Sequence, residues 1–125
     1  MLVALVATGC GGGKRPVAPG VVTRTATPYD AALCLDSDTF VVASAGRQVS
    51  GSSPGGVNFT VTFYKSPAAA AAALSHLDAK YATAIAATVV DYAGNPPAHP
   101  GGAPMTLTYD ELATLRHCIA LRRPG

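Results

Sequence analysis

Apolar and polar residues alternate from Val57 to Tyr64, and this period of two is typical of a strand with one buried face. The apolar residues share one side and are expected in the core: Val57, Phe59, Val61 and Phe63. The polar residues share the other side: Asn58, Thr60, Thr62 and Tyr64. The pattern therefore predicts a central strand whose polar side forms a possible binding surface.

A helix is predicted directly after this strand, because Ser66 can cap a helix that begins at Pro67. Six alanines follow, and alanine has the highest intrinsic helix propensity. An apolar stripe at helical spacing extends the prediction further along the chain: Leu74, Leu77, Tyr81 and Ala84. The β-branched segment Ala86–Tyr92 then predicts another strand.

Two further helices are predicted near the ends of the chain. Thr27 and Pro28 form a cap and first turn for a short helix that ends at Leu35. Thr108 and Glu111 have the spacing of a capping box and precede a second amphipathic segment. Arg122 and Arg123 suit the carboxyl end of that last helix.

The remaining segments are predicted as one strand, two loops and a linker. Thr39–Ala45 has the composition of a strand, and the glycine- and serine-rich Arg47–Gly56 is expected to be a loop. Ala93–Leu107 is rich in proline and glycine and predicts a long loop. Gly11–Thr27 shows neither helical nor strand periodicity and is expected to be a flexible linker.

These elements predict an α+β fold in the order helix, strand, strand, helix, strand, helix. The sheet is expected to be three-stranded and mixed, with the helices on one face, in a partial ferredoxin-like arrangement. The strands on either side of the alanine-rich helix are expected to run parallel, because a strand–helix–strand unit forms a crossover.

The charges are distributed unevenly along the chain. The net charge is +2, but the first 28 residues contain three cations and no acid: Lys14, Arg15 and Arg24. From Tyr29 onward six Lys and Arg residues face seven Asp and Glu residues, so this part carries about −1. A nucleic-acid-binding domain would need a basic face with interleaved aromatic residues, which this composition does not supply. Nucleic acid is therefore excluded as an expected partner.

The first ten residues form an apolar segment that ends in small residues and a cysteine. Val6–Cys10, VATGC, resembles a bacterial lipobox, in which small side chains precede the cleavage site and the cysteine thiol accepts a diacylglycerol. Residues 1–9 are then a signal-peptide remnant, 10–27 the lipid attachment site and linker, and 28–125 a small domain. A frayed apolar N-terminus on a cytosolic protein, with Cys10 as an idle thiol, is the alternative.

Three cysteines are an awkward number for an exported protein, because an odd count leaves one thiol unpaired. If Cys10 carries lipid, Cys34 and Cys118 remain as a possible disulfide, which an oxidising compartment would permit. Two buried free thiols are the alternative for this pair.

No catalytic set of residues is recognisable in the sequence, and we expect the protein not to be an enzyme. A nucleophile, a base and an orienting group are not brought together by any motif. His76, His99 and His117 lack metal-ligand spacing, and no cofactor is expected. Asp36 and Asp38 resemble the start of a calcium loop, but the downstream glycine and glutamate are missing.

The lipobox, the linker, the FTVTFYKSPAAAAAAL passage and the LATLRHCIA segment together resemble small lipoproteins of GC-rich Gram-positive bacteria. Such families generally have no assigned activity. The resemblance implies lipidation of Cys10, attachment to the extracytoplasmic side of the cell membrane, and Cys34 with Cys118 as a domain-bridging pair. We expect a binding or interaction module for a protein or small-molecule partner. The alternative is a small-ligand or metal carrier that uses His99 and Met105.

Overall fold

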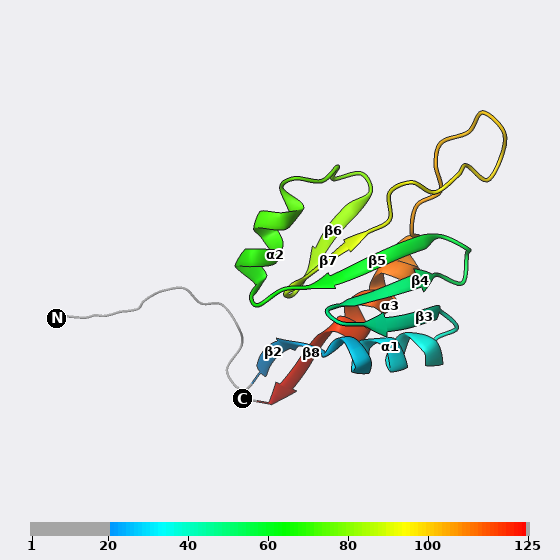
Figure 1. Cartoon of the computed structure of the whole chain (residues 1–125). Helices are drawn as coiled ribbons and strands as arrows, with labels where there is room; N and C mark the ends of the chain where they lie inside the picture. The colour runs from blue at the N-terminus through cyan, green and yellow to red at the C-terminus, as the bar shows by residue number, and fades with distance from the viewer. Residues whose placement is uncertain (1–20, 125) are drawn as a thin grey trace.

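The computed structural model describes residues 21–124, which form an α+β fold of three helices and two antiparallel sheets (Figure 1). The helices are α1 (Pro28–Ser37), α2 (Pro67–Leu74) and α3 (Tyr109–Ile119). The strands of the larger sheet are β3 (Val41–Ala45), β4 (Gln48–Ser52), β5 (Asn58–Phe63), β6 (Ala82–Ile85) and β7 (Thr88–Asp91). The smaller sheet pairs β2 (Val21–Thr25) with β8 (Ala120–Pro124).

The larger sheet has five strands in the order β3-β4-β5-β7-β6, so the prediction of three strands is wrong, although β5 is central as expected. Strand β4 occupies the segment predicted as a loop, Arg47–Gly56. Its sequence, QVSGS, contains one apolar residue, Val49, which is fully buried. Pairing with β3 and β5 stabilises this strand, and a single core residue gives little local signal.

The alanine-rich helix ends earlier than predicted, and a hairpin follows it. Helix α2 stops at Leu74, and the residues predicted to continue its apolar stripe lie beyond it, with Ala84 in β6. Strand β7 is antiparallel to β5, so the predicted parallel crossover to this strand is wrong. Since β6 is antiparallel to β7, β6 runs parallel to β5 but is separated from it by β7.

The core lies on the apolar face of β5, as predicted. Val57, Phe59, Val61 and Phe63 are all buried, and α1 and α3 pack against this side of the sheet. Phe40 contacts Phe59 edge to face, with 5.8 Å between the ring centroids.

Helix α2 covers part of the opposite face. Successive strand residues point to opposite faces, so Val89 points away from the core that contains Val90. Val89 is nevertheless only 3% exposed, so another element covers it. Helix α2 packs against the two strands of this hairpin, β6 and β7, and contributes the buried Ala70. The prediction that all helices lie on one face is therefore wrong, and only the β3–β5 part of the second face stays open.

The predicted helix caps are confirmed. Thr27 accepts a hydrogen bond from the backbone N–H of Asp30 in α1, and Ser66 accepts one from Ala69 in α2. Thr108 and Glu111 form the predicted capping box of α3. These local signals correctly placed the start of each helix.

The β2–β8 ribbon lies in two segments for which no strand was predicted. Strand β2 lies within the predicted linker, and its pairing with β8 makes Val21–Thr25 part of the fold. Arg122 and Arg123, predicted at the end of the last helix, belong to β8 because α3 ends at Ile119. Cys10 and residues 1–9 lie outside the described residues. Within residues 21–124, no helix has the length and hydropathy needed to cross a membrane.

Candidate functional site

The open part of the second sheet face carries small polar side chains from three strands. The register places Ser50 of β4 beside Thr60 of β5, and Asp91 of β7 on the other side of Thr60. Asn58 and Ser52 form the next pair along the same face. Because successive residues point to opposite sides of a strand, these side chains lie on the face away from Phe59 and Val61.

These residues line an open hollow of about 390 Å³, which we call the sheet hollow. Its lining consists of Ser50, Gly51, Asn58, Phe59, Thr60, Asp91 and Ala93. Asp91 is the one ionisable residue in this lining, and its Oδ1 accepts a hydrogen bond of 3.0 Å from the Ala93 N–H. The amide oxygen of Asn58 accepts a hydrogen bond of 2.8 Å from the Ser52 hydroxyl. The sheet hollow therefore offers hydroxyl and amide groups and one oriented carboxylate.

The structure divides the predicted binding surface between two places. Asn58 and Thr60 line the sheet hollow. Tyr64 lies past the end of β5 and lines a second hollow, together with Arg24 and Lys65. Thr62 lines neither hollow, and its hydroxyl accepts a hydrogen bond of 3.4 Å from the Gln48 side chain. The four residues share the polar side of one strand without forming one site.

Asn95, in the loop that follows β7, supports the sheet hollow. Its side chain is 5% exposed, and its Oδ1 accepts a hydrogen bond from the Asn58 N–H at 2.8 Å. Its Nδ2 donates to the carbonyl oxygens of Asn58 and Tyr92, both at 2.9 Å. The two bonds to Asn58 attach Asn95 to the start of β5, and the bond to Tyr92 attaches it to the end of β7, so Asn95 links the strands that carry Asn58 and Asp91.

Sequence reasoning missed Ser50, Asp91 and Asn95. Ser50 lies in the strand that was predicted as a loop, and the alternation of Gln48–Ser52 around Val49 is the one local signal for it. Asp91 reaches the polar face only through the antiparallel pairing of β5 with β7. Asn95 lies 37 residues from its partner Asn58, so local sequence carries no sign of the contact.

The loop after β7 is predicted correctly and projects from the body of the protein, away from β2 and β8 (Figure 1). An isolated bridge between Pro97 and Pro104 closes its base. His99 is exposed, whereas Met105 is partly buried against the core. The two residues suggested for a metal carrier therefore have different surroundings.

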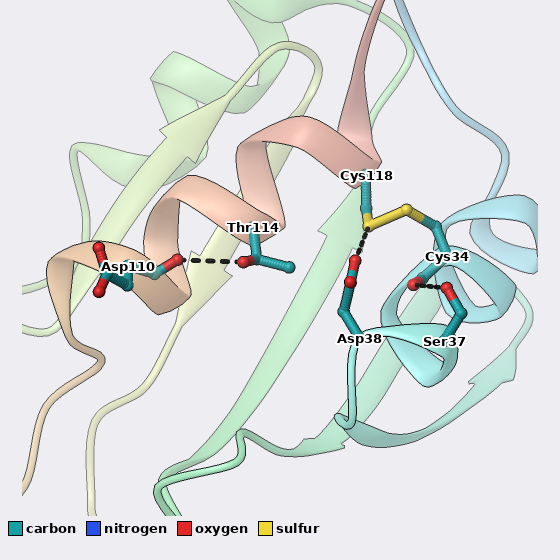
Figure 2. The surroundings of a disulfide bond; sticks show 6 residues. All are labelled: Cys34, Ser37, Asp38, Asp110, Thr114 and Cys118. Carbon is teal, nitrogen blue, oxygen red and sulfur yellow. Dashed lines mark hydrogen bonds between the residues drawn. A yellow bond between two sulfur atoms is a disulfide. The ribbon is translucent and has the colours of Figure 1, made fainter.

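Cys34 and Cys118 form a disulfide, as predicted, and it joins α1 to α3 (Figure 2). The Cα atoms are 5.6 Å apart, and Cys118 is 1% exposed. A carboxylate oxygen of Asp38 lies 3.9 Å from the Cys118 sulfur. Since a disulfide sulfur carries no hydrogen, this is a contact between a carboxylate and a sulfur and not a hydrogen bond.

Cys34, Asp38 and Cys118 are also the one group of three potential metal ligands within residues 21–124, with ligand atoms within 4.8 Å of one another. Metal coordination by cysteine requires a thiolate. In the disulfide form the two sulfur atoms are bonded to each other, so the group serves as a covalent link between two helices.

No protein-family model, curated protein or solved structure matches the chain. The two hollows, the projecting loop and the disulfide are therefore the features from which a function can be inferred.

Proposed function

We propose that the chain is a lipid-anchored, extracytoplasmic binding domain of the bacterial cell envelope, and that it holds a polar ligand in the sheet hollow. The observation that carries this proposal is the placement of the sheet hollow relative to the linker. Strand β2, which occupies the last part of the predicted linker, lies beside the carboxyl end of β5, where Arg24 and Tyr64 line the same hollow. Asn58, at the start of β5, belongs to the sheet hollow.

This arrangement separates the attachment point from the ligand site by the length of β5. Six residues of antiparallel strand span roughly 17 Å. A domain tethered through Cys10 would therefore present the sheet hollow and the loop 93–107 away from the lipid. The Cys34–Cys118 disulfide also supports an extracytoplasmic location, because disulfides persist in oxidising compartments.

The lining of the sheet hollow favours a ligand rich in hydroxyl or amino groups. Asp91 supplies an acceptor for a charged or neutral donor, while Ser50 and Thr60 can both donate and accept. A ligand with a carboxylate or phosphate would be repelled by Asp91, and the lining contains no cation. We infer binding and not catalysis, because Asp91 is the one ionisable group in this lining and no second acid–base group lies there to act with it on the Ser50 or Thr60 hydroxyl.

The anchor is tested by metabolic labelling with palmitate in a bacterial host that processes lipoproteins. We expect the full chain to incorporate label and the Cys10→Ala variant to incorporate none, because a thioether needs the thiol. A Cys34→Ala/Cys118→Ala variant is the matched control and should keep the label. Label that survives Cys10→Ala would contradict the anchor.

The ligand site is tested by NMR titration with soluble cell-wall oligosaccharides and with spermidine, as hydroxyl-rich and amine probes. We expect shifts at Asn58, Thr60 and Asp91, and about a tenfold weaker affinity in Asp91→Asn, which loses the charged acceptor. Thr62→Val is the control, because Thr62 shares the strand face and lines neither hollow. Shifts confined to other surfaces with both probes would refute this site.

A further inference from the structure

The second hollow lies at the carboxyl end of β5 and differs in charge from the first; we call it the basic hollow. It measures about 600 Å³, and its polar lining comes from Arg24, Thr25, Tyr64 and Lys65. Both charged residues in this lining are cations, and none of the lining residues is an acid. Both cationic side chains are exposed, so an anion can reach them from solvent.

Three separate elements hold the basic hollow together. Thr25 of β2 accepts a hydrogen bond of 3.0 Å from the Ala87 N–H in the β6–β7 turn. The Tyr64 N–H donates to the Ala87 carbonyl oxygen at 2.8 Å. Pro28 and Pro67, the first residues of α1 and α2, also lie in the wall, and the positive end of the α2 dipole, whose first turn contains no acid, adjoins the cations.

The two ends of β5 carry opposite charge. Arg24 and Lys65 line the hollow at its carboxyl end, where the Phe63 N–H donates to the Arg47 carbonyl oxygen at 2.8 Å. At the other end, Asp91 lines the sheet hollow and Glu111 accepts a hydrogen bond from Gly55 in the β4–β5 turn. The near-neutral total charge therefore conceals a polarity along the strand.

The positive end of β5 is the end next to β2, where the predicted tether joins the fold. Ten residues separate Cys10 from Val21, the first residue of β2. A flexible chain of that length has a root-mean-square reach of roughly 16 to 19 Å. If Cys10 is lipidated, the end of the domain that carries β2 and the basic hollow is thus kept close to the bilayer, where anionic headgroups are concentrated.

We propose that the basic hollow binds the phosphate groups of anionic phospholipids and docks the tethered domain on the membrane surface. Arg24 and Lys65 make the headgroup contacts, and the sheet hollow then faces away from the lipid. The proposal rests on the proposed lipid anchor for its orientation, but the headgroup contacts themselves do not require Cys10.

The test measures binding of the full chain carrying Cys10→Ser, which has no lipid, to vesicles. The vesicles contain phosphatidylcholine alone or with one third phosphatidylglycerol, and sedimentation at low salt gives the partition coefficient. We expect binding only to the anionic vesicles. The Arg24→Ala/Lys65→Ala variant should bind about 25-fold more weakly, because each cation near an anionic surface contributes roughly fivefold in affinity.

A second double variant tests whether vesicle binding depends on the basic hollow or only on the net charge of the protein. Lys80→Ala/Arg116→Ala removes the same charge from exposed residues outside the basic hollow and should change binding less than threefold. The Arg24→Lys/Lys65→Arg variant keeps the charge and should retain binding. Circular dichroism confirms that each variant is folded before its binding is compared.

Two outcomes would overturn the proposal. One is an equal loss of binding in both alanine pairs, which would leave net charge as the sole cause. The other is the absence of binding to the anionic vesicles. If glycerol phosphate still shifts the NMR signals of Arg24 and Lys65 in that case, the ligand of the basic hollow is a soluble phosphate and not a lipid. The palmitate experiment is independent of both, so failure of docking and failure of the anchor are distinguishable.

Discussion

Glu111 joins the start of α3 to the β4–β5 turn through both of its carboxylate oxygens. Oε1 accepts a hydrogen bond from the Thr108 N–H at 3.0 Å, and Oε2 accepts one from the Gly55 N–H at 2.9 Å. Burial raises the pKa of Glu111, but hydrogen bonds from Thr108, Ser53 and Gly55 outweigh it and leave the pKa below its ordinary value. The ionised carboxylate is therefore favoured in the folded protein.

Replacement of Glu111 by alanine should lower the free energy of unfolding by about 2 kcal/mol, because a capping box and a loop contact are lost together. The stabilisation by Glu111 should be complete above the unfolded-state pKa of about 4.3 and decline as the pH falls through the lowered folded-state pKa. Urea unfolding between pH 3 and pH 7 measures this dependence.

Two variants control the Glu111 measurement. Glu111→Gln keeps the volume and one acceptor, so it should lose the pH-dependent part of the stabilisation. Asp110→Asn removes an exposed acid from the same helical turn and should change the free energy of unfolding by less than about 0.5 kcal/mol. An unchanged pH profile in Glu111→Gln would contradict the assigned role.

Strand β4 depends on a close approach to its neighbour β3 at Gly51. A Cβ atom at this position would lie 1.9 Å from the Val41 carbonyl oxygen, which is backbone and cannot rotate away. Gly51 is paired with Val42 on one side and Phe59 on the other, so a shift here disturbs both ladders. The glycine that made this segment resemble a loop is thus the residue that allows it to pair.

Gly51→Ala should lower the free energy of unfolding by about 3 kcal/mol or detach β3 from the sheet, because the added methyl group overpacks a fixed backbone. Thermal unfolding and amide hydrogen exchange of Val41–Ala45 distinguish the two results. Ser50→Ala is the control and should cost less than about 0.5 kcal/mol, since Ser50 is exposed in the same strand. Native stability and native protection in Gly51→Ala would refute the close approach.

The disulfide acts on the whole molecule, because it joins α1 to α3 across 84 residues of sequence. Closing a loop of that length stabilises the folded state by about 4 to 5 kcal/mol in the chain-entropy model. The free energy of unfolding of native proteins is about 5 to 15 kcal/mol in total, so this bond supplies a large share of the stability. This dependence fits a domain that works outside the reducing cytosol.

A Cys34→Ala/Cys118→Ala variant should therefore lose about 4 to 5 kcal/mol in denaturant unfolding. The wild-type protein in excess dithiothreitol should show a similar loss, and Cys10→Ser should show none. Reactive-thiol counting under denaturing, non-reducing conditions gives an independent measure. Reactivity of Cys34 and Cys118 in the oxidised protein would show that the bond is absent in solution.

Local interactions account for what the sequence by itself determined. Each helix start follows from a cap within three residues, and the buried face of β5 follows from strict alternation. The disulfide was predicted from the count of three cysteines together with the lipobox resemblance, which reserves Cys10 for lipid and leaves Cys34 and Cys118 as the pair. The helix starts and the buried face of β5 depend on neighbours along the chain, so they need no knowledge of the tertiary structure.

Only the tertiary structure decided the sheet order, the β2–β8 ribbon and the composition of the two hollows. The pairings of β2 with β8 and of β5 with β7 join segments far apart in sequence, such as Thr25 with Ala120, and β4 contains a single apolar residue. Their stability comes from partner strands and not from local propensity. For the same reason the polar side of β5 was predicted as one surface, whereas strand pairing divides it between two hollows, one lined by Asp91 and the other by Arg24 and Lys65.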